Sequence, residues 1–135
     1  LMKSKITNRY DINGNVIEEM KYDSEGILTS RAYSKFDSIG NHIAWSMFDS
    51  EGNLSLLSSE ELYLKEYSKW TRKYDSSGKP IETFFYDSNE ELKQKFVYKY
   101  SGNRDYEYVV YAYEYKFGKM QEIPVKKITF EYEEY

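Results

Sequence analysis

The chain has 135 residues, a mass of 16.2 kDa and a net charge of −4 at pH 7. This length suits one domain, and the 19% aromatic content, with 16 Tyr, favours strands over a helical bundle. The lack of Cys excludes disulfides and thiolate metal sites, the acidic balance argues against a nucleic-acid partner, and the sequence has no apolar run of the ~20 residues that a membrane span needs.

A short motif recurs along the chain: an aromatic residue followed by Asp and, three positions after the Asp, by Gly. Good copies begin at Tyr10, Tyr22, Phe36, Phe48 and Tyr74, and weaker copies begin at Tyr86 and Tyr100. The aromatic residues are 12, 14, 12, 26, 12 and 14 positions apart, so two motifs form a 26-residue double unit. The single gap of 26 predicts a degenerate turn near Ser58–Glu61.

Each motif has the residue types of a hairpin turn. Asp can accept a hydrogen bond from the backbone N–H two residues on, and Gly readily takes the left-handed conformation. A type I turn followed by a Gly bulge is a common hairpin connection. The predicted turn residues are Asp11, Gly14, Asp23, Gly26, Asp37, Gly40, Asp49, Gly52, Asp75 and Gly78.

Segments of about eight residues between the turns alternate apolar and polar side chains. The clearest are residues 15–22, 42–48, 93–100 and 125–132. They predict an all-β fold, an antiparallel β-meander of 12/14-residue hairpin repeats in an open or partly rolled sheet. Residues 58–70 fit a strand in phase with the repeat, although the opening Ser58–Glu61 also fits the capping box of a helix.

The chain is expected to form a single β-repeat domain over residues 1–135, with a repeat array over 1–103. Residues 104–135 are rich in Tyr and predict a capping hairpin, with a turn at 117–119 and Pro124 at an edge or a strand start. Because a thin sheet cannot bury every ring, some aromatic side chains are expected to bind a partner. The candidates are Tyr111, Tyr113, Tyr115, Trp45 and Trp70.

The Tyr-Asp-x-x-Gly motif resembles the YD repeats of the RHS family of bacterial secreted and cell-surface proteins, over residues 10–103. A looser likeness connects it to the MORN-like variant repeats. The resemblance implies a repeat architecture and a secreted or cell-surface location, and it transfers no catalytic residue. The chain departs from a plain YD array in its 12/14 alternation and in having too few units to enclose a cargo.

The sequence has little that points to catalysis. His42, the only histidine, is expected to be a solvated residue at a strand start rather than a catalytic base, and no Gly-rich phosphate loop is present. Adjacent acidic pairs are expected to point to opposite faces of strands, which separates their carboxylates. These pairs are Glu60/Glu61, Glu90/Glu91 and Glu133/Glu134.

Two turns imitate the opening of a calcium loop, because oxygen ligands occupy alternate positions. They contain Asp11, Asn13 and Asn15, and Asp49, Glu51 and Asn53. Neither has the acidic residue at the twelfth position of an EF-hand, and the turn itself explains these residues. No catalytic residue, cofactor or metal is therefore expected.

These observations predict a non-enzymatic repeat module that binds a protein or glycan partner or serves as a scaffold. An alternative is a carbohydrate-binding module or small glycan-acting protein of an envelope system, which needs exposed coplanar rings or two facing carboxylates. An immunity or antitoxin-like binder is a third alternative. Self-association through edge strands is also open.

Overall fold

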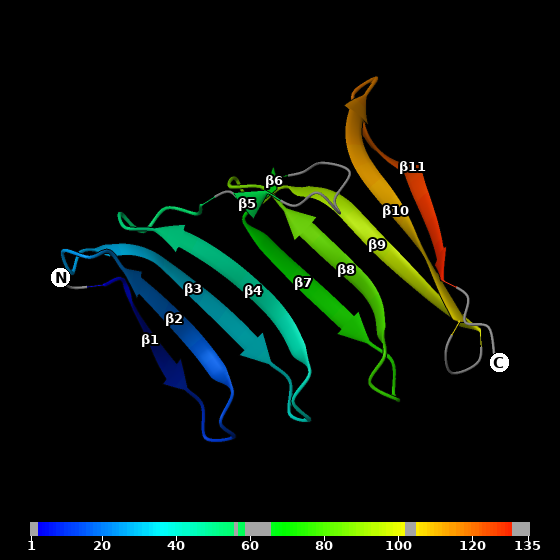
Figure 1. The fold of residues 1–135 in the computed structure, drawn as a ribbon. Helices are drawn as coiled ribbons and strands as arrows, with labels where there is room; N and C mark the ends of the chain where they lie inside the picture. Colours follow the sequence, from blue (N-terminus) through cyan, green and yellow to red (C-terminus); the bar gives the residue numbers. More distant parts are fainter. Residues whose placement is uncertain (1–2, 56, 59–65, 102–104, 131–135) are drawn as a thin grey trace.

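The computed structural model describes residues 3–55, 57–58, 66–101 and 105–130 (Figure 1). Nine strands form one antiparallel sheet in the order β1-β2-β3-β4-β7-β8-β9-β10-β11, and β5 pairs with β6 separately. Because β1 and β11 are the two edges, the sheet is open, and the predicted antiparallel meander is confirmed. The strands are β1 Lys5–Tyr10, β2 Val16–Tyr22, β3 Leu28–Phe36, β4 His42–Asp49, β5 Leu57–Ser58, β6 Glu66–Tyr67, β7 Lys69–Tyr74, β8 Pro80–Tyr86, β9 Leu92–Ser101, β10 Asp105–Lys116 and β11 Lys119–Phe130.

The motif forms the turn that its residues predict. In the turn after β4, Asp49 Oδ1 accepts the N–H groups of Glu51 and Asn53, each at 2.9 Å. The Gly52 N–H donates to the Asp49 carbonyl at 3.1 Å, and Gly52 has a left-handed φ of 87°. The bulge that follows shifts the register, so that the aromatic residue of a motif faces the residue six positions on, as Phe36 faces His42.

The weak copy of the motif that begins at Tyr86 forms the same turn without glycine. Asp87 Oδ1 accepts the N–H groups of Asn89 at 2.9 Å and Glu91 at 3.0 Å. Glu90 occupies the glycine position with a φ of 62°. The Asp therefore specifies the turn even where Gly is missing. The weak copy after Tyr100 runs into residues 102–104, outside the described residues.

The 26-residue gap adds no strand to the nine-stranded sheet. Met47 O accepts the Ser55 N–H at 2.9 Å, and Met47 N–H donates to Ser68 O at 3.0 Å, so Ser55 and Ser68 share the position opposite Met47. Between them, β5 and β6 pair only with each other, and β7 then continues beside β4. The turn predicted near Ser58–Glu61 falls on residues 59–61, outside the described residues, whereas the described residues 66–67 and 69–70 are in strands.

Cross-strand pairing sorts the side chains onto two faces of the sheet, because directly paired residues lie on the same face. Trp45 pairs with Trp70, Trp70 with Phe85, and Phe85 with Gln94. We call this side the aromatic face, and its rings include Phe36, His42, Trp45, Trp70, Phe85, Phe96, Tyr98, Tyr100, Tyr106, Tyr108 and Phe130. The opposite side, the charged face, carries Arg9, Glu18, Arg31, Tyr33, Phe48, Lys69, Lys95, Tyr111 and Tyr113.

The hydrophobic core lies on the aromatic face over β8, β9 and β10. Phe85, Phe96 and Val110 are buried, and the rings of Phe85 and Phe96 lie 5.2 Å apart. Tyr67 of β6 packs edge-on against Phe85 at 5.3 Å, so its ring covers this part of the core. The core is small because a single sheet layer buries only the centre of one face.

The last two strands extend beyond the sheet. The pairing of β9 with β10 ends at Gln94 and Ala112, whereas β10 and β11 remain paired up to Lys116 and Lys119. Residues 113–122 thus form a two-stranded projection, here called the hairpin arm, which rises out of the sheet in Figure 1. Pro124 lies within the edge strand β11 beside a register shift, which confirms its predicted edge position. β11 begins at Lys119 rather than at residue 125, and residues 131–132 lie outside the described residues.

Candidate functional site

The two tryptophans predicted to bind a partner lie on the aromatic face, away from the candidate tyrosines. The guanidinium of Arg72 lies 4.6 Å from the centre of the Trp70 ring, and Trp70 packs against the core. Trp45 contacts Tyr67 with ring centres 6.0 Å apart. Both tryptophans are half-buried within the sheet's own aromatic packing. They form no joint site with the tyrosines, because the tyrosines lie on the opposite face of the sheet.

His42 is not the solvated residue that the sequence predicts. Its ring stacks on Phe36 at 4.7 Å and meets the edge of Trp70 at 4.6 Å. The Nε2 atom is buried without a hydrogen-bond partner. Burial, together with the nearby positive charge of Arg72, lowers the pKa of the imidazole. The bulge after the turn turns this side chain onto the aromatic face, where a neutral ring is favoured.

The three candidate tyrosines share the charged face but differ in their surroundings. Lys95 Nζ lies 5.0 Å from the centre of the Tyr111 ring and 2.9 Å from Glu122 Oε2. The Tyr113 hydroxyl donates to the same Glu122 oxygen at 2.7 Å. Hydrogen bonds from Lys95 and Tyr113 lower the pKa of Glu122. Tyr111 and Tyr113 are thus engaged within the sheet, whereas Tyr115 is 71% exposed.

The exposure of Tyr115 extends over the tip of the hairpin arm. Its cross-strand partner Met120 is 54% exposed, and Phe117 in the turn is 97% exposed. Phe117 also has a left-handed φ of 52°. Lys116 and Lys119 are cross-strand partners on either side of the turn, beside these apolar side chains. The arm tip is therefore an apolar patch with Lys119 beside it, while the Lys116 ammonium is paired with Glu114 at 3.3 Å.

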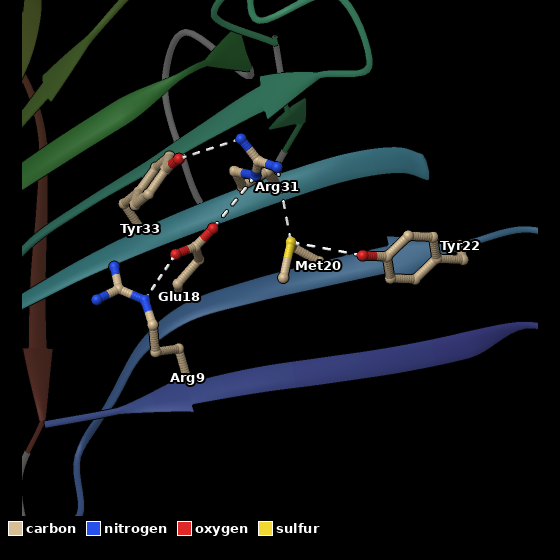
Figure 2. A network of polar contacts seen from close by, with 6 residues as sticks. All are labelled: Arg9, Glu18, Met20, Tyr22, Arg31 and Tyr33. Carbon is tan, nitrogen blue, oxygen red and sulfur yellow. Dashed lines mark hydrogen bonds and ion pairs between the residues drawn. The ribbon is translucent and has the colours of Figure 1, made fainter. Parts of the chain in front are cut away.

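A polar network, shown in Figure 2, crosses the charged face between β1, β2 and β3. Glu18 binds Arg9 through Oε2 at 2.9 Å and lies 3.2 Å from Arg31 Nε through Oε1. Among the described residues, the other two Arg31 nitrogens contact the Tyr33 hydroxyl at a long 3.5 Å and the weak acceptor Met20 Sδ at 3.6 Å. Arg31 therefore retains donor capacity for a ligand.

Sequence reasoning did not find this network. Its only signal in the sequence is a spacing of two residues, which places Glu18 and Met20 on one face of a strand, and Arg31 and Tyr33 on one face of the next strand. The pairing of Glu18 with Tyr33 and of Met20 with Arg31 sets these side chains together. That register depends on the bulge, which the charges alone do not reveal.

Beside the network, a hollow of about 470 Å³ opens on the charged face. Tyr33 and Phe48 pack edge to face at 5.5 Å in its wall. A smaller hollow of about 130 Å³ shares these two rings. We call the first the large hollow, and it is lined by Leu28, Arg31, Tyr33, Phe48, Asp49, Ser50, Glu51 and Gly52.

The carboxylates of the turns are engaged by the turns themselves. Asp11 accepts the N–H groups of Asn13 and Asn15 through Oδ1, and the Asn15 side-chain amide through Oδ2. These hydrogen bonds, led by those from Asn15, lower the pKa of Asp11. Within the described ranges, no three His, Cys, Asp or Glu side chains lie close enough together to hold a metal ion.

The acidic pair Glu90/Glu91 does not lie on a strand, so the prediction of opposite strand faces is wrong for it. Both residues belong to the turn between β8 and β9, where Glu90 pairs with Lys69 at 3.4 Å and Glu91 with Lys93 at 3.1 Å. The pairs Glu60/Glu61 and Glu133/Glu134 lie outside the described residues. The described pair thus forms two separate ion pairs, one with each neighbouring lysine.

Comparisons with known proteins assign the chain to no family. No protein-family model matches the chain, and no curated protein sequence matches it. Among solved structures, the chain is similar to a DUF3836 family protein from Bacteroides vulgatus ATCC 8482, at 15% identity and a TM-score of 0.33. The match covers 96% of this chain and 99% of that protein, and it is too distant to bear on function. No helix in the described part of the chain is long and apolar enough to cross a membrane.

Proposed function

We propose that the chain is a non-enzymatic module that binds another macromolecule through its open sheet. The observation that supports this most is its exposed surface. The accessible area is 9447 Å², whereas a compact protein of this mass exposes about 7,500 Å². The excess of about 2,000 Å² exceeds the roughly 800 Å² that one partner contributes to a standard interface.

A sheet that covers itself on only part of one face contributes to this excess. The arm tip, with Tyr115 and Phe117, adds exposed apolar side chains that suit the centre of an interface. We therefore place the main contact at the hairpin arm and the adjoining charged face. Of the three tyrosines predicted from sequence, Tyr115 carries the binding role, and Tyr111 and Tyr113 support the arm.

Surface plasmon resonance against a panel of cell-surface proteins and glycans tests this function. We expect saturable binding that Tyr115→Ser weakens at least tenfold, since truncating a central aromatic contact commonly costs that much. Ser24→Ala, in an exposed turn, is the matched control and should leave affinity unchanged. Turnover of a bound ligand that is lost in His42→Gln, with the fold intact by circular dichroism, would overturn the non-enzymatic assignment.

Carbohydrate binding is the second candidate function, supported by the large hollow. Arg31 offers weakly engaged donors there, Tyr33 and Phe48 offer apolar rings, and Glu51 offers an acceptor. Sugars are bound by this combination of ring surface and planar polar groups. Titration calorimetry with oligosaccharides should show binding that Arg31→Met removes. Arg9→Met is the control, because Arg9 also binds Glu18 but does not line the hollow.

We also propose that the module acts outside the cell, as the likeness to YD repeats implies. Fractionation of cells that express the full-length gene should place the protein in the medium or at the surface. Recovery only from the cytoplasm would contradict this location and leave the binding function to be tested separately.

A further inference from the structure

Phe117 is an unusual residue at the end of the hairpin arm. It and Gly118 form a two-residue loop with φ values of 52° and 73°, closed by the pairing of Lys116 with Lys119. Two positive φ values define a type I′ turn, for which Asn-Gly is the preferred pair. A bulky side chain is disfavoured at such a φ, and a large apolar ring that is 97% exposed is disfavoured by water as well.

Two independent costs at one residue indicate that the ring is kept for a contact that the isolated chain does not make. Tyr115 and Met120 extend the apolar surface around it. Lys119 adds a positive charge in the same hairpin, whereas the Lys116 ammonium is paired with Glu114 at 3.3 Å. A partner that fits this tip must therefore offer an apolar recess with negative charge at its rim.

The large hollow has both properties. It is lined by the apolar side chain of Leu28, the rings of Tyr33 and Phe48, and the carboxylates of Asp49 and Glu51. Arg31 also lines it, with its charge paired to Glu18. Its volume of about 470 Å³ gives room for an aromatic side chain. The hollow lies on β3 and β4, far along the sheet from the arm on β10 and β11, so one molecule presents both surfaces at once (Figure 1).

We propose that the arm tip of one molecule docks in the large hollow of a second copy of this chain, with Phe117 as the anchor. This inference rests on the proposed binding function and names the partner. The contact is head-to-tail, because the tip and the hollow are different surfaces, and repetition of it builds chains or closed rings. The net charge of −4 disfavours an anionic lipid surface as the occupant.

Sedimentation velocity of the purified chain, from micromolar to millimolar concentration, tests the proposal. We expect concentration-dependent association whose dissociation constant rises at least tenfold in Phe117→Asn and in Glu51→Lys. Asn fits the left-handed φ and removes only the ring, and Glu51 is exposed, so both variants should fold. Ile39→Ser is the control, because Ile39 is an exposed apolar turn residue outside both surfaces.

A mixing experiment makes the test specific for a head-to-tail contact. Phe117→Asn keeps an intact hollow and Glu51→Lys keeps an intact tip, so the two monomeric variants should combine into a 1:1 dimer. A mixture that stays monomeric while the parent associates would overturn the proposal and indicate a symmetric contact such as edge-strand pairing.

Two further results would overturn the docking proposal. One is a parent that stays monomeric throughout; if it still binds a protein or glycan in the resonance assay, the proposed function stands and only its partner is wrong. The other is co-sedimentation with phosphatidylserine vesicles that Phe117→Asn abolishes, without self-association, which would assign the tip to a lipid surface.

Discussion

The left-handed turn residues should contribute to stability through the backbone alone, and Gly52→Val isolates this contribution. At Gly52 the φ is 87°, and an added Cβ would meet no atom within 4 Å. The cost of the substitution is therefore conformational rather than steric crowding by neighbours. The left-handed region costs an L-residue about 1–2 kcal/mol, and more if it is β-branched, whereas removing glycine from the unfolded chain returns about 0.5–1 kcal/mol. We expect a net loss of about 1–2 kcal/mol.

Urea unfolding followed by tryptophan fluorescence measures this loss. The midpoint should fall with the m-value unchanged, and the melting temperature should fall by about 3–8 °C. Ser50→Ala, two residues earlier in the same turn, should stay within a degree of the parent. Equal stability of Gly52→Val and the parent would show that the turn is not held in the left-handed form that the argument needs.

Three further predictions concern single residues. Glu90→Gly should stabilise the fold by about 0.5 kcal/mol, because relief of the left-handed conformation outweighs glycine entropy and a weak exposed ion pair with Lys69; a lower urea midpoint would contradict this. His42→Ala should destabilise the fold. Because burial lowers the pKa of His42, the parent protein should lose stability as the pH falls below the ordinary histidine pKa of 6.5, and His42→Gln should show a flatter dependence of stability on pH. Identical pH profiles of the parent and His42→Gln would exclude a buried neutral imidazole. Hydrogen bonds from the Ser77 hydroxyl and the Lys79 N–H lower the pKa of Asp75. The ionised Asp75 should therefore stabilise the fold above pH 3.8, and this contribution should be lost as the pH falls further. Asp75→Asn should remove this loss from a measurement of stability against pH in acid.

The turn chemistry is local, and this is why the sequence predicts most of the fold. Asp49 and Gly52 determine the hairpin that they occupy, because the hydrogen bonds involved join residues at most four positions apart. Regular spacing of such turns leaves an antiparallel meander as the simplest arrangement. Even the turn that has Glu90 in place of glycine forms in the same way, because it keeps the Asp three positions before.

Contacts between distant segments are where sequence reasoning failed. His42 was expected in solvent, but the bulge after the turn directs it between Phe36 and Trp70. The turn predicted in the 26-residue gap falls on residues 59–61, outside the described residues, but the spacing did not reveal that Ser55 and Ser68 share one position opposite Met47. Spacing alone does not distinguish an extra pair of strands from a segment that leaves the sheet, because both preserve the phase of the repeat.

The candidate site likewise has features that the sequence predicts and features that only the tertiary structure decides. The sequence by itself determined that the chain is an all-β repeat with an aromatic end, because composition and turn residues act locally. Only the tertiary structure decided that Tyr111 and Tyr113 are engaged while Tyr115 and Phe117 are exposed at the arm tip, and that Arg31 lies beside a hollow. The exposure of a side chain depends on where the neighbouring strand ends, and its proximity to other side chains depends on which residues share a face of the sheet. Both follow from the register between strands rather than from any one segment.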